Sequence, residues 1–144
     1  MLLRSPVFAN QGRIPPRYTC DGDDVSPPLE IVDLPAEAES LALVMDDPDA
    51  PAGVWDHWIL YDLPPVEEIP EGTDLGTPGT NSWGRLGYGG PCPPGGVHRY
   101  VFHVFALDRE LGLPPGADKA TVLAAAADHV LDEASLIGLY GRGT

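Results

Sequence analysis

The sequence predicts a mainly β domain of packed antiparallel sheets in a β-sandwich-like arrangement, with one helix near the C-terminus. Short apolar runs recur along the chain between clusters rich in Gly, Pro and Asp, which is the pattern of antiparallel strands joined by irregular loops. Glycine and proline, 17 of each, separate these runs and form no repeat. At 144 residues the chain fits one core, so we expect a single domain over residues 1–144.

Three apolar runs are the clearest strand candidates, at residues 40–45, 57–63 and 99–107. Each has strand length and is bounded by residues that favour turns. A fourth run, at residues 136–140, predicts a short final strand.

One segment, residues 119–134, predicts a helix. Alanines and larger apolar residues, including Val130 and Leu131, recur there at helical spacing, and Asp118 is suited to cap the first turn.

Three long loops separate the strands, at residues 46–53, 64–84 and 87–97. They are rich in Pro, Gly, Asp and Thr and too polar to belong to a core. Long loops of this kind are where binding groups are expected.

The charge balance argues against nucleic acid as a partner. The formal net charge is −14, and only 8 Lys and Arg residues are present, whereas phosphate backbones are bound by clustered basic residues. Anionic membrane surfaces are disfavoured for the same reason. No apolar segment approaches the length of a membrane span, and Arg4 interrupts the start that a secretory signal would need, so we expect a cytoplasmic protein without membrane insertion.

The two cysteines, Cys20 and Cys92, lack the Cys-x-x-Cys spacing of zinc or thioredoxin-like sites. In a cytoplasmic protein we expect both to be reduced thiols, and a bridge between them is the alternative that the sequence leaves open.

Period-two alternation predicts which polar side chains share a face of the third strand. His98 and Tyr100 point the same way at its start, while His103 points to the opposite face. We therefore expect His98 and Tyr100 at a pocket mouth and His103 in a structural role. His129, among alanines of the predicted helix, is also expected to be structural.

His57 begins the second strand, and alternation places it on the face of Ile59 and Tyr61. The acidic segment before it, residues 46–51, is either an ordinary acidic turn or part of a site. The loop at residues 87–96 combines prolines, which restrict the backbone, with glycines, which allow close approach, so it is suited to direct amide donors at an anion.

Together these segments resemble the phosphatidylethanolamine-binding protein family, in the bacterial branch labelled Raf-kinase-inhibitor-like. The resemblance rests on Asp47-Pro48-Asp49-Ala50-Pro51, His57-Trp58, Gly89-Gly90-Pro91-Cys92-Pro93-Pro94 and His98-Arg99-Tyr100, in that order along the chain. It extends over nearly the whole sequence, from Ile14-Pro15 to Arg142.

The resemblance implies packed antiparallel sheets and a small, solvent-open pocket for phosphate-like or carboxylate-like anions, including a phospholipid headgroup. It also implies a regulatory, kinase-inhibitor-like role with a protein partner, and a homodimer. The residues that match the family's pocket are Asp47, Trp55, His57, Gly90, Pro91, His98 and Tyr100.

The chemistry of these residues suits an anion. An aspartate beside two imidazoles favours their charged forms, so we expect His57 and His98 to donate as imidazolium groups. The Tyr100 hydroxyl and a Gly90 amide add further donors.

Two alternatives use the same residues. His57, His98 and Asp47 contain the groups for hydrolase or transferase chemistry, but the sequence has no Gly-x-Ser-x-Gly motif. Two histidines and two aspartates are also adequate metal ligands, but no His-Glu-x-x-His motif is present. We expect a binding protein that needs no cofactor or metal, rather than an enzyme.

Overall fold

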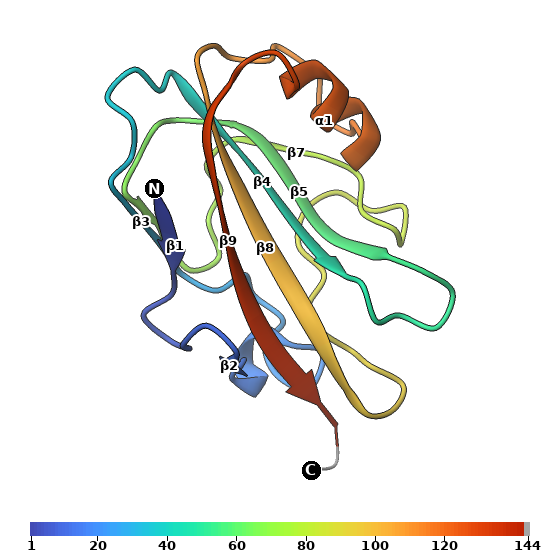
Figure 1. The fold of residues 1–144 in the computed structure, drawn as a ribbon. Helices are drawn as coiled ribbons and strands as arrows, with labels where there is room; N and C mark the ends of the chain where they lie inside the picture. The colour runs from blue at the N-terminus through green and yellow to red at the C-terminus, as the bar shows by residue number, and fades with distance from the viewer. Residues whose placement is uncertain (143–144) are drawn as a thin grey trace.

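The longest strands of the computed structural model, β8 and β9, lie side by side within a six-stranded sheet (Figure 1). The strand order is β2-β9-β8-β4-β5-β7, and all pairings are antiparallel except that of β2 with β9. These strands are β2 (Gly12–Arg13), β4 (Ser40–Asp47), β5 (Trp55–Leu63), β7 (Thr77–Pro78), β8 (Val97–Leu107) and β9 (Val130–Gly141). The model describes residues 1–142, so the last two residues of the domain predicted for 1–144 lie outside the described part.

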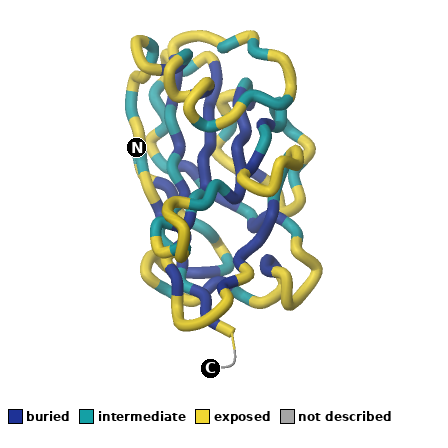
Figure 2. Tube along the Cα trace, turned by 90° about the vertical axis from the view of Figure 1, so that its right-hand side faces the viewer, coloured by how far each residue is buried: buried dark blue, intermediate teal, exposed yellow. Residues whose placement is uncertain are grey.

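A smaller sheet packs against one face of the large one. Its antiparallel strands are β1 (Leu2–Arg4), β3 (Leu29–Val32) and β6 (Glu68–Ile69), and a 3-10 turn, η1, covers Pro16–Tyr18. The main hydrophobic cluster joins the two sheets, with Leu3 and Ile31 from the small sheet and Leu43 and Phe102 from the large one. Figure 2 shows the result, with buried central strands enclosed by exposed loops.

The α-helix of the described residues, α1 (Lys119–Ala126), covers the other face of the large sheet. Val122 and Ala126 pack there in a second hydrophobic cluster with Val44 and Ile59. Within residues 1–142 no helix is long and apolar enough to cross a membrane.

The predicted fold class is confirmed, and so are the three main strands. Each is slightly longer than its apolar run because polar residues at its ends still pair with neighbours: β4 extends to Asp47 and β5 begins at Trp55. The predicted cap is also present, since Asp118 accepts a hydrogen bond from the Thr121 amide at 2.9 Å.

The helix ends earlier than its sequence pattern predicted. Residues 119–134 were expected to be helical, but α1 stops at Ala126 and β9 begins at Val130. From there the chain pairs with β8, beginning with Val130 opposite Leu107. Helical spacing is a local preference, and the hydrogen bonds along a long neighbouring strand override it.

The free-thiol prediction is wrong, because Cys20 and Cys92 form a disulfide. The prediction depended on the expected cytoplasmic location, where disulfides are rare. The fold brings the two loops together, with the Cys20 amide donating to the Pro91 carbonyl at 3.1 Å and the Cα atoms 5.4 Å apart. That separation lies within the ordinary range for a disulfide.

We predict that the double variant Cys20→Ser, Cys92→Ser lowers the free energy of unfolding by about 2–4 kcal/mol, because the bond joins segments 72 residues apart and restricts the unfolded chain. Urea denaturation with and without reductant measures this. The native protein should lose stability on reduction and the variant should not. Two thiols that react freely in unfolded, unreduced protein would contradict the disulfide.

Candidate functional site

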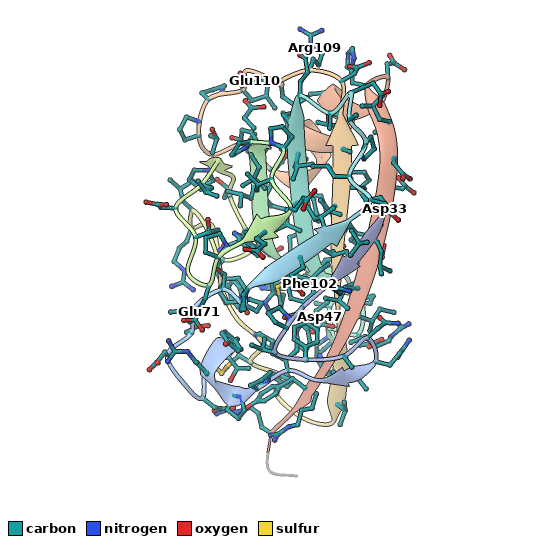
Figure 3. All side chains as sticks on the ribbon, turned by 90° about the vertical axis from the view of Figure 1, so that its left-hand side faces the viewer. Asp33, Asp47, Glu71, Phe102, Arg109 and Glu110 are labelled. Atoms are coloured by element: carbon teal, nitrogen blue, oxygen red, sulfur yellow. A yellow bond between two sulfur atoms is a disulfide. The ribbon has the colours of Figure 1, made fainter. Side chains whose placement is uncertain are left out.

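A pocket of about 310 Å³ opens where β4 ends and where β5 and β8 begin. In Figure 3, Asp47 lies in the lower half of the molecule, away from Arg109 and Glu110 at the opposite end. The lining residues are Asp47, Ala50, Pro51, Ala52, Trp55, His57, Trp83, Cys92, Pro93, Pro94, His98 and Tyr100.

The three aspartates at the end of β4 and just after it have different partners. The Asp46 Oδ2 atom lies 3.5 Å from Lys119 Nζ of α1, on the face of the sheet that α1 covers. Asp49 accepts two hydrogen bonds from the Arg99 side chain at 2.8 and 2.9 Å, and these bonds lower the pKa of Asp49 to about 2. Of the three, only Asp47 lines the pocket. The interpretation as part of a site therefore holds for Asp47, and the interpretation as an ordinary acidic turn holds for the other two.

Asp47 and His98 form a buried pair at the floor of the pocket. The His98 Nδ1 atom lies 2.6 Å from the Asp47 Oδ2 atom, and the two residues are only 7% and 4% exposed. A carboxylate accepts, so Nδ1 carries the proton and donates it. The other Asp47 oxygen accepts from the Asp49 amide at 2.8 Å. His98 therefore has its Nε2 atom available for a ligand.

His57 enters the pocket through a β-bulge. Met45 pairs with Trp58 and Asp46 pairs with Asp56, so β5 has one extra residue here, His57. A bulge turns side chains away from strict alternation. The expectation that His57 shares the face of Ile59 and Tyr61 is therefore wrong, because those two residues pack toward α1 while His57 lines the pocket.

His57 is held as a neutral imidazole. Its Nδ1 atom lies 2.7 Å from the Gly89 carbonyl oxygen, and because a carbonyl only accepts, Nδ1 must carry the proton. Burial lowers the pKa of His57, with the Gly89 hydrogen bond and the Asp47 charge acting as smaller opposing effects. The expected imidazolium donor is thus wrong for His57, since desolvation outweighs the attraction of Asp47.

The Gly90-Pro91 loop does not present its amide to the pocket. The Gly90 amide donates to Asp24 Oδ1 at 2.8 Å, and neither Gly90 nor Pro91 lines the pocket. A Cβ atom at Gly90 would lie 2.3 Å from that same oxygen, so the close approach to Asp24 requires glycine. The Gly90 amide therefore does not serve as the expected donor. Pro93 and Pro94 of the same loop form the wall of the pocket here.

Two hydrogen-bond donors of the pocket have no partner among residues 1–142. These are the buried Nε1 atom of Trp55 and the hydroxyl of Tyr100. Burial, and then the Asp47 charge, raise the pKa of Tyr100, so its hydroxyl keeps its proton. Both side chains were predicted pocket residues, and both line it.

Sequence reasoning missed Trp83, which forms an aromatic wall. Its ring meets that of His57 edge-on at 4.9 Å and that of Trp55 at 5.5 Å. It lies in the long loop before β8, where no periodicity indicates its direction. A large aromatic residue within a Gly- and Pro-rich loop was the available signal.

The other two histidines lie outside the pocket. His103 is on the α1 face of β8. Its Nε2 atom lies 3.8 Å from Asp46 Oδ2, and its Nδ1 atom lies 3.2 Å from the Ser135 hydroxyl. His129 pairs with Asp108 at 3.0 Å.

We predict that His57 makes the protein less stable in acid. In the unfolded chain its pKa is near 6.5, and folding lowers it. Between the two values the unfolded state binds more protons, so the free energy of unfolding falls as pH falls below 6.5, by up to about 1.4 kcal/mol per pH unit. Urea denaturation from pH 5 to 8 should show a smaller loss in His57→Gln. His103→Gln, on the opposite face, should keep the wild-type slope, and equal slopes in all three proteins would refute this role of His57.

Comparisons with known proteins agree with this architecture. A family model described as phosphatidylethanolamine-binding protein matches residues 4–141. A UPF0098 protein of Methanothermobacter thermautotrophicus is 53% identical over 151 residues, covering 99% of this chain and 100% of that protein. The crystal structure of a phosphatidylethanolamine-binding protein homolog from Chlamydia trachomatis has a TM-score of 0.95 at 40% identity, covering 98% of this chain and 97% of that one. E. coli YbcL, described as a member of the mammalian family, has a TM-score of 0.88 at 27% identity, with 97% of each chain covered. The chain belongs to the phosphatidylethanolamine-binding protein family.

Proposed function

We propose that this chain is a binding protein whose pocket holds a small anionic group, such as a phosphate, a phospholipid headgroup or a carboxylate. The observation that carries the proposal is the pair of buried donors, Trp55 Nε1 and the Tyr100 hydroxyl, that lack a partner within residues 1–142 and belong to the pocket lining. A buried donor without a partner costs about 1–3 kcal/mol. A ligand with acceptor oxygens removes this cost.

His98 contributes to the same site. Because Asp47 accepts a hydrogen bond from His98 Nδ1, the ring is held in one orientation. Its Nε2 atom is then the ring nitrogen that can contact a ligand. Protonated His98 donates from Nε2, and the hydrogen bond to an anion is then charge-assisted.

The electrostatics favour a modest affinity. Among the described residues of the lining there is no Lys or Arg, and the whole chain carries a net charge of −14. Distant carboxylates are screened by salt, so the donors within the pocket decide whether an anion binds. Long-range steering nevertheless opposes its approach.

Binding fits these residues better than the two alternatives. The Asp47–His98 pair resembles an acid–base pair, but the cysteine beside it, Cys92, is bonded to Cys20 and offers no thiolate. For a metal, Asp47 and the Nδ1 atom of His98 are already engaged with each other. Within residues 1–142 no three His, Cys, Asp or Glu side chains are arranged to hold a metal ion.

We predict that Tyr100→Phe weakens the binding of inorganic phosphate by roughly tenfold, since it removes one donor worth about 1.4 kcal/mol. Its stability should stay the same or rise, because the hydroxyl has no partner within residues 1–142. NMR titration gives the affinity and urea denaturation the stability. Tyr140→Phe is the matched control: its hydroxyl donates to Asp21 at 2.6 Å outside the pocket, so it should lose stability and keep binding. The reverse pattern would contradict the site.

We also predict that His98→Ala weakens phosphate and phosphoethanolamine binding by about 1.5–3 kcal/mol, the value of a charge-assisted hydrogen bond. Asp47→Asn should weaken it too, because His98 loses the carboxylate that accepts its Nδ1 hydrogen bond and orients the ring. NMR titrations between pH 5.5 and 8.5 measure both effects, with His103→Ala as the control outside the pocket. If phosphate shifts no resonance of His98 or Tyr100 at any pH, the proposed function is wrong.

A further inference from the structure

We propose that His57 accepts a hydrogen bond from the bound ligand, and that the pocket therefore selects oxyanions that carry an acidic hydrogen, phosphate monoesters above all, over sulfate esters and phosphate diesters. This inference rests on the proposed function and specifies its ligand class. It follows from the hydrogen bonds that hold the His57 ring in the bulge of β5.

The orientation of the ring determines which atom meets the ligand. Nδ1 donates to the Gly89 carbonyl at 2.7 Å, so Nε2 is the ring nitrogen that His57 can offer to the pocket it lines. In a neutral imidazole the second nitrogen holds a lone pair. The ring is 3% exposed and its plane is confined edge-on by Trp83 and Tyr100, with centroids 4.9 and 5.2 Å away. It is not free to turn and exchange the two nitrogens.

The surroundings of His57 favour its neutral form, because burial outweighs the nearby charges. Asp47 of β4 and Asp24 of the neighbouring loop favour protonation, as do the backbone hydrogen bonds to Gly89 and Gly90, but burial acts in the opposite direction and is the largest effect. The pocket thus combines two donors, on Trp55 and Tyr100, with an acceptor at His57.

A matching ligand needs acceptor oxygens and one acidic hydrogen. The monoanion of a phosphate monoester has both, because its second pKa is about 6. A sulfate monoester has the same charge and nearly the same shape but carries no hydrogen at neutral pH. In the pocket, which His57 and Asp47 both line, its oxygen would face the lone pair of His57 Nε2 and the carboxylate of Asp47 with no hydrogen between them.

The deciding experiment compares methyl phosphate, methyl sulfate and dimethyl phosphate at pH 6.5 by NMR titration of the wild-type protein. We expect methyl phosphate to bind at least roughly tenfold more tightly than the other two, because only methyl phosphate can donate a hydrogen bond to His57 Nε2. Nitrogen-15 shifts of His57 should show an unprotonated Nε2 before and after binding. Equal affinity for methyl phosphate and methyl sulfate, or protonation of His57 on binding, would overturn the inference while the proposed function stands.

A matched pair of variants tests the residue itself. His57→Leu removes the acceptor and should bring the affinities for methyl phosphate and methyl sulfate close together, whereas His103→Leu should keep the preference. If His57→Leu does not fold, the wild-type ligand series and the nitrogen-15 shifts still decide. Binding of ethanolamine alone would assign the acceptor to an ammonium group and overturn the inference. Failure of phosphate, phosphoethanolamine and carboxylates to bind would overturn the proposed function and this inference together.

Discussion

The position of β4 between β5 and β8 is the constraint on which the rest of the structure depends. Its pairings with both neighbours place Leu41, Leu43 and Met45 in the core between the sheets. The same alternation carries Asp47 to the pocket face and Asp46 to the α1 face. The hydrophobic core and the pocket therefore share one register, and a shift of one residue would exchange the two aspartates.

The pocket combines residues of long strands with a loop that a disulfide holds in place. Asp47, His98 and Tyr100 lie on long strands, and the loop that carries Pro93 and Pro94 is held to the loop of Cys20 by the disulfide and by the Cys20 amide. A ligand that binds such a preformed site pays little for ordering it. Such a site would lower the cost of the anion binding that we propose for this acidic protein.

The polar groups of the site are divided between those that pair within the protein and those that have no partner within residues 1–142. Asp49 accepts hydrogen bonds from Arg99, and the Gly90 amide donates to Asp24. The Tyr100 hydroxyl and Trp55 Nε1 have no such partner within residues 1–142. The sequence alone does not separate these two kinds of polar group, because their partners come from segments far apart in the chain.

Local patterns in the sequence determined the strands, the cap of α1 and the common face of Tyr100, Phe102 and Val104, because period-two alternation and turn residues act over a few neighbours. The motifs also determined the family and five of the lining residues: Asp47, Trp55, His57, His98 and Tyr100. Tertiary structure decided where α1 ends, that Cys20 meets Cys92, and how His57 is directed. Each of these depends on pairing between distant segments: β8 draws the chain after residue 129 into β9, and the extra residue in β5 reverses the face of His57. The protonation of His57 was likewise decided by burial and by the Gly89 carbonyl, neither of which a sequence pattern records.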